Sequence, residues 1–102
     1  MTNTIHSMGF QALITALSEG RAAKGWTMRE LARKLNCHVH TVANIEHGQR
    51  RIDVIELIAI ARVLDLDPEQ LFSLVVKKAT LAELTNNFNR KAGSAGESAK
   101  TE

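Results

Sequence analysis

Residues 27–48 decide the fold of this 102-residue chain, and they read TMRELARKLNCHVHTVANIEHG. A small residue, Ala32, is followed four positions later by Asn36, a residue that tolerates the left-handed backbone of a tight turn. Val42 and Ile45 follow, three positions apart, which places them on one face of a helix. This order of small, turn and apolar residues predicts two short helices that pack across a tight turn, a helix-turn-helix.

Local signals mark the ends of these two helices. Thr27 and Glu30 have the spacing of a capping box, in which each side chain accepts a hydrogen bond from the backbone N–H of the other residue. The helix that follows Thr27 is short because Asn36 breaks it. The second is expected to run from about Val39 to Glu46, before Gly48. The residues expected on the buried face of the helix after Thr27 are Leu31, Ala32 and Leu35.

A longer helix is expected before this stretch. Its residues at spacings of three and four are Phe10, Leu13, Ile14, Leu17 and Arg21. Gly25 is expected to end the helix, and Trp26 to pack over that end.

Two more helices are expected after the stretch. Asp53 and Glu56 form a second capping box, and Asp67 precedes Pro68, which suits the first position of a helix because its missing N–H costs nothing there. The residues expected to bury the fourth helix are Val54, Leu57, Ile58, Ala61 and Leu64. Those expected to bury the fifth are Leu71, Phe72, Leu74 and Val75.

The capping pattern recurs at Thr80 and Glu83 and predicts a sixth helix with an apolar stripe of Leu81, Leu84 and Phe88. We therefore expect an all-α chain: a five-helix bundle with a helix-turn-helix and a sixth, C-terminal helix. The expected organisation is a DNA-binding domain at residues 8–76, a helical extension at residues 77–90 that is a candidate for dimerisation, and a disordered tail at residues 91–102, rich in Gly, Ser, Ala and charge.

The composition limits the classes of protein to which this chain can belong. The single cysteine permits no internal disulfide, which favours a reduced, cytoplasmic compartment. The first residues lack the basic and apolar pattern of a signal peptide, and no apolar run approaches the roughly 18 residues that span a bilayer.

Charge is unevenly distributed along the chain. Residues 24–51 carry six basic and two acidic side chains, a net charge of +4, whereas residues 52–72 carry one basic and five acidic side chains, a net charge of −4. Such asymmetry orients a molecule in front of a polyanion and favours nucleic-acid binding.

Residues 13–72 resemble the lambda-repressor-like, Cro/C1-type (XRE) helix-turn-helix family. The matching residues are Arg21, Gly25, Trp26, Thr27, Glu30, Leu31, Ala32, Leu35, Thr41, Val42, Ile45, Glu46, Gly48, Arg50, Asp53, Leu57, Ala61, Leu64 and the run Asp67 to Phe72. The resemblance implies a five-helix bundle, DNA binding with the third helix in the major groove, and a dimer. This chain departs from the family pattern at Met28, Gly20 and Asn36, where the family often has Gln, an apolar residue and Gly.

The resemblance also implies roles for individual residues. Arg21 and Glu46 match a family pair that joins the first helix to the end of the third, and we expect this ion pair to position the third helix. The candidates for base contact lie opposite Val42 and Ile45 on the third helix and are Val39, His40, Ala43 and Asn44. The candidates for DNA phosphate contact are Thr27, His38, Thr41, His47, Gln49, Arg50 and Arg51. His38 stands at the helix-capping position, so capping is its competing role.

Cys37, His38, His40 and His47 suggest a metal site, but a zinc site needs four converging ligands. Cys37 matches a position that the family fills with a buried apolar residue, and we expect it to act as a small buried hydrophobe. We expect no metal, no cofactor and no enzymatic activity, because no catalytic constellation or phosphate-binding glycine loop is present.

The favoured function is a transcription regulator, expected to be a repressor, that binds double-stranded DNA at an inverted repeat as a homodimer. The residues expected at the dimer interface are Leu74, Val75, Leu81, Leu84 and Phe88. The alternative for the last three is that they fold back as extra core. Two other functions stay open: an antitoxin with a protein partner, and a protein-binding adaptor of the same fold.

Overall fold

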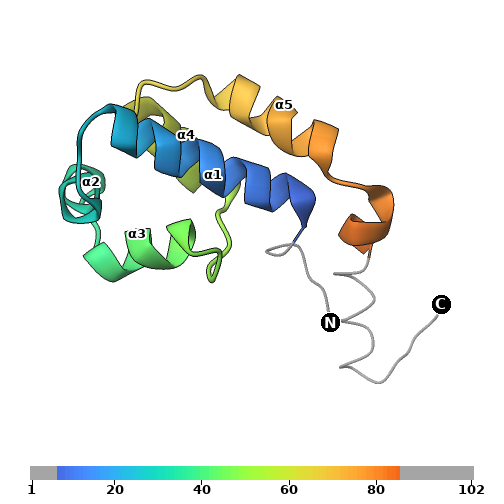
Figure 1. The fold of residues 1–102 in the computed structure, drawn as a ribbon, viewed down its shortest axis with the longest axis horizontal. Coiled ribbons are helices and arrows are strands. Elements are labelled where there is room, and N and C mark those ends of the chain that lie inside the picture. Colours follow the sequence, from blue (N-terminus) through green and yellow to red (C-terminus); the bar gives the residue numbers. More distant parts are fainter. Residues whose placement is uncertain (1–6, 86–102) are drawn as a thin grey trace.

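The computed structural model describes residues 7–85, and its regular secondary structure there is entirely helical. The helices are α1 (Met8–Ala23), α2 (Met28–Leu35), α3 (Val39–Glu46), α4 (Val54–Val63) and α5 (Pro68–Lys78) (Figure 1). Residues 81–85 are also helical and lie within the expected sixth helix. The prediction of an all-α chain with five helices and a C-terminal sixth is confirmed. Phe88 and the expected tail at residues 91–102 lie outside the described residues.

The helix ends follow the local signals. The Thr27 hydroxyl accepts from the backbone N–H of Glu30 at 3.0 Å, and the Thr27 N–H donates to the Glu30 carboxylate at 2.7 Å. Asp53 and Glu56 make the same reciprocal pair at the start of α4. Asn36 ends α2 with a left-handed φ of 58°.

The core lies where α1 passes through the middle of the bundle, between α5 and α3 (Figure 1). Its buried residues come from all five helices and from the end of α4: Leu13, Leu17, Leu31, Ala32, Val42, Ile45, Leu57, Ile60, Ala61, Leu64 and Leu71. Burial of these side chains removes apolar surface from water and is the main force that holds the short helices together.

Glycines allow two close approaches to α1. A Cβ on Gly9 would lie 2.8 Å from the carbonyl oxygen of Val75, so α1 and α5 pack backbone against backbone at this point. A Cβ on Gly20 would lie 2.9 Å from the Leu66 side chain. The atom approached is a terminal methyl group of Leu66, so a larger residue at position 20 would require the Leu66 side chain to move.

Two expectations about buried residues are wrong. Val54 is 66% exposed, whereas Ile60, which was not expected in the core, is only 5% exposed. Phe72 on α5 is 58% exposed. The segment that forms α4 is apolar around most of its circumference, so its own periodicity could not decide which face meets α2 and α5.

Candidate nucleic-acid interface

Helix α3 has one buried face and one face open to solvent. Val42 and Ile45 are 2% and 5% exposed and anchor the helix in the core. His40 and Asn44 are exposed on the other side, and Ala43 is half-buried between them. The structure therefore places two polar side chains, one helical turn apart, on a surface that has no packing role.

Val39 differs from this pattern. As a candidate for base contact opposite Val42 and Ile45, Val39 should be exposed, but it is half-buried and packs against the core. Packing alone therefore explains an apolar residue at this position, and a contact between Val39 and a thymine methyl stays a prediction.

The turn between α2 and α3 corrects the expectation for Cys37. The residue is exposed, because it follows the left-handed Asn36 and its N–H donates to the carbonyl of Ala32 at 2.9 Å. The small thiol side chain leaves open a hollow of about 160 Å³ that it lines together with Leu35 and Ile45.

His38 caps the N-terminus of α3. Its Nδ1 accepts from the backbone N–H of His40 at 3.3 Å, and the two imidazole rings lie 4.8 Å apart. Both rings are exposed at the start of the helix. The capping role that competed with phosphate contact is thus present, through a long hydrogen bond.

Arg21 joins α1 to the end of α3. Its Nε and Nη2 donate to the two oxygens of Glu46 at 2.7 and 2.9 Å, and its Nη1 donates to the carbonyl of Trp26 at 2.8 Å. The hydrogen bond to Glu46 raises the pKa of Arg21. The two side chains are 17% and 5% exposed, so this ion pair is shielded from most of the solvent.

Arg50 makes a second forked ion pair that the sequence reasoning missed. Its Nη2 and Nη1 donate to Glu56 at 2.6 and 3.1 Å, and Nη1 also donates to the carbonyl of Arg51 at 3.0 Å. The pKa of Glu56 is lowered, chiefly by Arg50 and then by the N–H of Asp53. The capping box identifies Glu56 as a helix-capping residue, but no spacing in the sequence predicts that Arg50, which precedes the helix, pairs with it.

The other candidates for phosphate contact are spread around α3. His47, Gln49, Arg51 and Thr27 are exposed, and Thr41 is half-buried. Both polar groups of Thr27 take part in the capping box of α2, so any phosphate would have to share them.

Two arginines of α2 also lie beside α3 and were not assigned a role from the sequence. Arg29 and Arg33 line a surface hollow of about 430 Å³ together with the turn residues and Val39. Both are exposed. Their position next to the N-terminus of α3 could have been inferred from their place on α2, since residues four apart share a helix face.

Part of the basic charge is already neutralised. The ammonium group of Lys24 hydrogen-bonds to Asp65, and the ammonium groups of Lys24 and Lys34 lie 5.6 and 4.7 Å from the centre of the Trp26 ring. These contacts hold Trp26 over the end of α1. The net charge of +4 in residues 24–51 therefore overstates the charge available to an external polyanion.

The described part of the chain contains neither a metal-binding cluster nor a membrane-spanning helix. Within residues 7–85, no three His, Cys, Asp or Glu side chains come together in a way that could hold a metal ion. No helix in this part of the chain has the length and apolar character needed to cross a membrane.

A helix-turn-helix family model matches residues 17–71, more than half of the chain. Among curated protein sequences, no significant match is found. Solved structures do match. An XRE-family like protein from Pseudomonas syringae pv. tomato str. DC3000 is 39% identical, with a TM-score of 0.64 over 72% of this chain and 90% of that one.

Two further structures are named as regulators. The restriction-modification controller protein C.AhdI from Aeromonas hydrophila is 29% identical, with a TM-score of 0.56 over 61% of this chain and 90% of that chain. The clp gene regulator ClgR from C. glutamicum is 25% identical, with a TM-score of 0.60 over 72% of this chain and 95% of that chain. With its capped helix-turn-helix and exposed α3 face, this chain belongs to the Cro/C1-type (XRE) helix-turn-helix family of DNA-binding transcription regulators.

Proposed function

We propose that the protein is a sequence-specific repressor that binds an inverted-repeat operator as a homodimer, with residues 8–76 as the DNA-binding domain. The exposed face of α3 carries this proposal. The helix is anchored in the core by Val42 and Ile45 and presents His40 and Asn44 outward. A helix held in this way can enter the major groove without losing its packing. Occupying an operator blocks access to it, so repression is the expected effect.

The exposed side chains suit base recognition. The amide of Asn44 can form two hydrogen bonds with adenine, and the imidazole of His40 can donate to guanine. Ala43, half-buried between them, lets the helix approach the base edges closely, and Val39 can contact a thymine methyl at the edge of the groove.

Groups around α3 suit contact with the DNA backbone, which fixes register without reading sequence. The residues proposed for this role from the sequence are Thr27, His38, Thr41, His47, Gln49 and Arg51. Arg29 and Arg33 join them because they line the hollow beside the start of α3. Arg50 is considered separately below, since its guanidinium already has a carboxylate partner.

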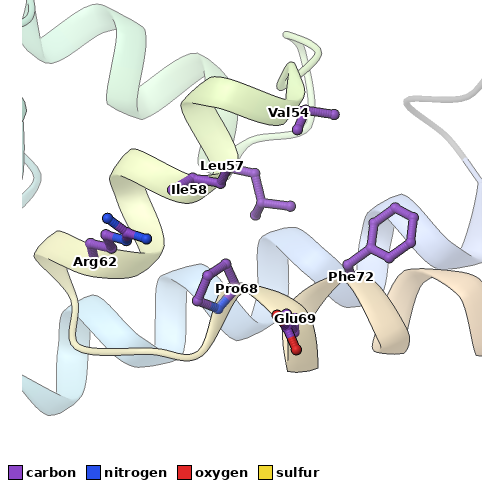
Figure 2. Close-up of a pocket in the computed structure, with 7 residues that line it drawn as sticks. All are labelled: Val54, Leu57, Ile58, Arg62, Pro68, Glu69 and Phe72. Carbon is purple, nitrogen blue, oxygen red and sulfur yellow. The ribbon is translucent and has the colours of Figure 1, made fainter.

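A dimer is needed because one helix-turn-helix contacts too few base pairs to specify a site in a genome. The structure leaves an apolar groove of about 680 Å³ between α4 and α5, and its lining includes Val54, Ile58 and Phe72 (Figure 2). Val54 and Phe72 are 66% and 58% exposed and line the same hollow, and a contiguous exposed apolar patch often marks an interaction site.

The charges of this groove favour a second copy of the chain as its occupant. Arg62 and Glu69, of opposite sign, line the same space (Figure 2). In a two-fold interface the same patch meets itself, so Arg62 of each copy can approach Glu69 of the other. We therefore propose the α4–α5 groove as the main dimer surface.

The interface expected from the sequence lies farther along the chain. Leu81 and Leu84 are 75% and 41% exposed, which suits a binding role, whereas Leu74 and Val75 are half-buried and Val75 packs on the core. The exposure of Leu81 favours the second candidate function, an antitoxin whose extension at residues 77–90 holds a protein partner. In that case the same core binds DNA.

Selection of bound duplexes from random DNA tests the main proposal. The expected result is a two-fold symmetric motif whose half-sites lie about one helical turn apart. A pool with no enriched motif would contradict sequence-specific binding. An enriched single half-site would contradict the dimer but retain the base-reading role of α3.

A further inference from the structure

Arg50 holds the segment between α3 and α4 at its downstream end. Its guanidinium forms two hydrogen bonds with Glu56, the third residue of α4, and one with the backbone carbonyl of Arg51. The same Glu56 carboxylate accepts from the N–H of Asp53 at 3.0 Å. The Arg50–Glu56 pair therefore fixes both the start of α4, through the carboxylate, and the peptide group that follows Arg51, through the guanidinium.

The upstream end of this segment is fixed as well. The N–H of Gln49 donates to the carbonyl of Asn44 in α3 at 2.8 Å, and Gly48 is buried with a φ of +72°, which a glycine adopts readily. Gln49 and Arg51 thus lie on a short segment tied to α3 at one end and to α4 at the other. Both of these side chains are exposed.

The forked pair makes Arg50 poorly suited to hold a phosphate itself. A guanidinium that turned toward DNA would leave the Glu56 carboxylate without its strongest partner, close to a second anion. The hydrogen bonds from Arg50 lower the pKa of Glu56 further below its ordinary acidic value, so they favour the ionised carboxylate. The pair favours binding by staying intact, because a segment between α3 and α4 that is ordered before DNA binds loses less entropy on binding.

We propose that Arg50 is a positioning residue: through Glu56 and the carbonyl of Arg51, it presents Arg51 and Gln49 to the DNA backbone without gripping a phosphate itself. This inference rests on the proposed DNA-binding function. It predicts that Glu56, an acidic residue beside a DNA-binding surface, strengthens operator binding.

The test measures operator affinity of the full chain over a series of salt concentrations, using the duplex obtained by selection. Glu56→Gln removes a negative charge and would strengthen binding if charge alone mattered. If Glu56 acts by positioning Arg51 and Gln49, Glu56→Gln should instead weaken operator binding about tenfold. That is the effect of losing one charge-assisted hydrogen bond. Arg50→Gln should weaken binding by a similar factor, and the double variant should be no weaker than either single variant.

The salt dependence separates positioning from direct contact. Each phosphate contact contributes about 0.9 to the slope of log K against log salt, so Arg51→Gln in a dimer should reduce the slope by about two. Arg50→Gln should leave the slope unchanged. Arg50→Lys keeps the charge but loses the planar fork, and it should bind as weakly as Arg50→Gln.

Glu83→Gln is the matched control, because Glu83 belongs to a capping box with Thr80 outside the proposed surface. It should leave operator affinity unchanged, and all affinities are compared well below each variant's melting temperature. Stronger binding by Glu56→Gln, or full affinity of Arg50→Lys, would overturn the inference and make Arg50 a phosphate contact. A wild-type chain that binds no duplex would overturn the proposed function and the inference together.

Discussion

Arg21 and Glu46 lie 25 positions apart in the sequence and form a two-pronged ion pair, with Nε–Oε2 and Nη2–Oε1 distances of 2.7 and 2.9 Å. The same guanidinium donates to the carbonyl of Trp26, just before α2. One side chain of α1 thus holds the entry to the helix-turn-helix and the end of its second helix. The orientation of α3 is therefore set from α1.

Arg21→Ala should lower the free energy of unfolding by about 1–3 kcal/mol, because it leaves the shielded Glu46 carboxylate without its partner. Urea denaturation measures the change, and Arg21→Lys should recover only part of it because lysine lacks the planar fork. The salt slope of DNA binding should stay as in the wild type. Unchanged stability together with a reduced slope would mean that Arg21 contacts DNA instead.

Asn44→Ala and His40→Ala should each cost about 1–3 kcal/mol on the selected operator and much less on random duplex, because they remove hydrogen bonds to base edges. Arg51→Ala should weaken both complexes by a similar factor, since phosphates are present in every sequence. Competition titrations with the two duplexes give these ratios. If Asn44→Ala and Arg51→Ala show the same ratio, the division of roles between α3 and the following segment is wrong.

Operator binding should weaken steeply with salt. Arg29, Arg33 and Arg51 are exposed beside α3, so we expect them to supply the main phosphate contacts of each subunit. Six such contacts in a dimer give a log–log slope of about −5. A slope near zero, measured between low and physiological salt, would rule out this basic surface as the DNA contact.

Phe72→Asp should convert the dimer to a monomer, because it places a charge in the apolar groove between α4 and α5. Leu81→Asp is the matched control on the other exposed apolar surface and should leave the dimer intact, as should truncation after Lys78. Arg62→Glu should also dissociate the dimer, and adding Glu69→Arg should restore it. Analytical ultracentrifugation distinguishes these states, and dissociation by Leu81→Asp alone would place the interface at residues 81–88.

Gly9→Ala should destabilise the bundle, because the new Cβ would lie 2.8 Å from the carbonyl oxygen of Val75, and a backbone atom cannot move aside as a side chain can. The strain should outweigh the better helix propensity of alanine and leave a net loss of about 1–2 kcal/mol. Gly25→Ala is the comparison: no atom lies within 4 Å of its new Cβ, so only its φ of +74° opposes the change, at roughly 1 kcal/mol. A more stable Gly9→Ala protein, seen in urea denaturation, would contradict the close packing of α1 on α5.

The sequence by itself determined the helices and the motif. The expected bounds of α3, Val39 to Glu46, are those of the structure, and Asn36 turns the chain in the left-handed region as predicted. These features depend on hydrogen bonds between residues only two to four positions apart, as in the capping boxes at Thr27 and Asp53. Interactions of such short range depend only on the local sequence and not on the rest of the fold.

Only the tertiary structure decided which faces are buried and which charges are paired. The segment that forms α4 is apolar nearly all round, so the choice of Ile60 over Val54 for the core came from the position of its neighbours. Cys37 turned outward because of the backbone path after Asn36. Arg50 met Glu56 because the segment between α3 and α4 brings the two side chains together across the start of α4, and such a pairing depends on the path of the chain in space.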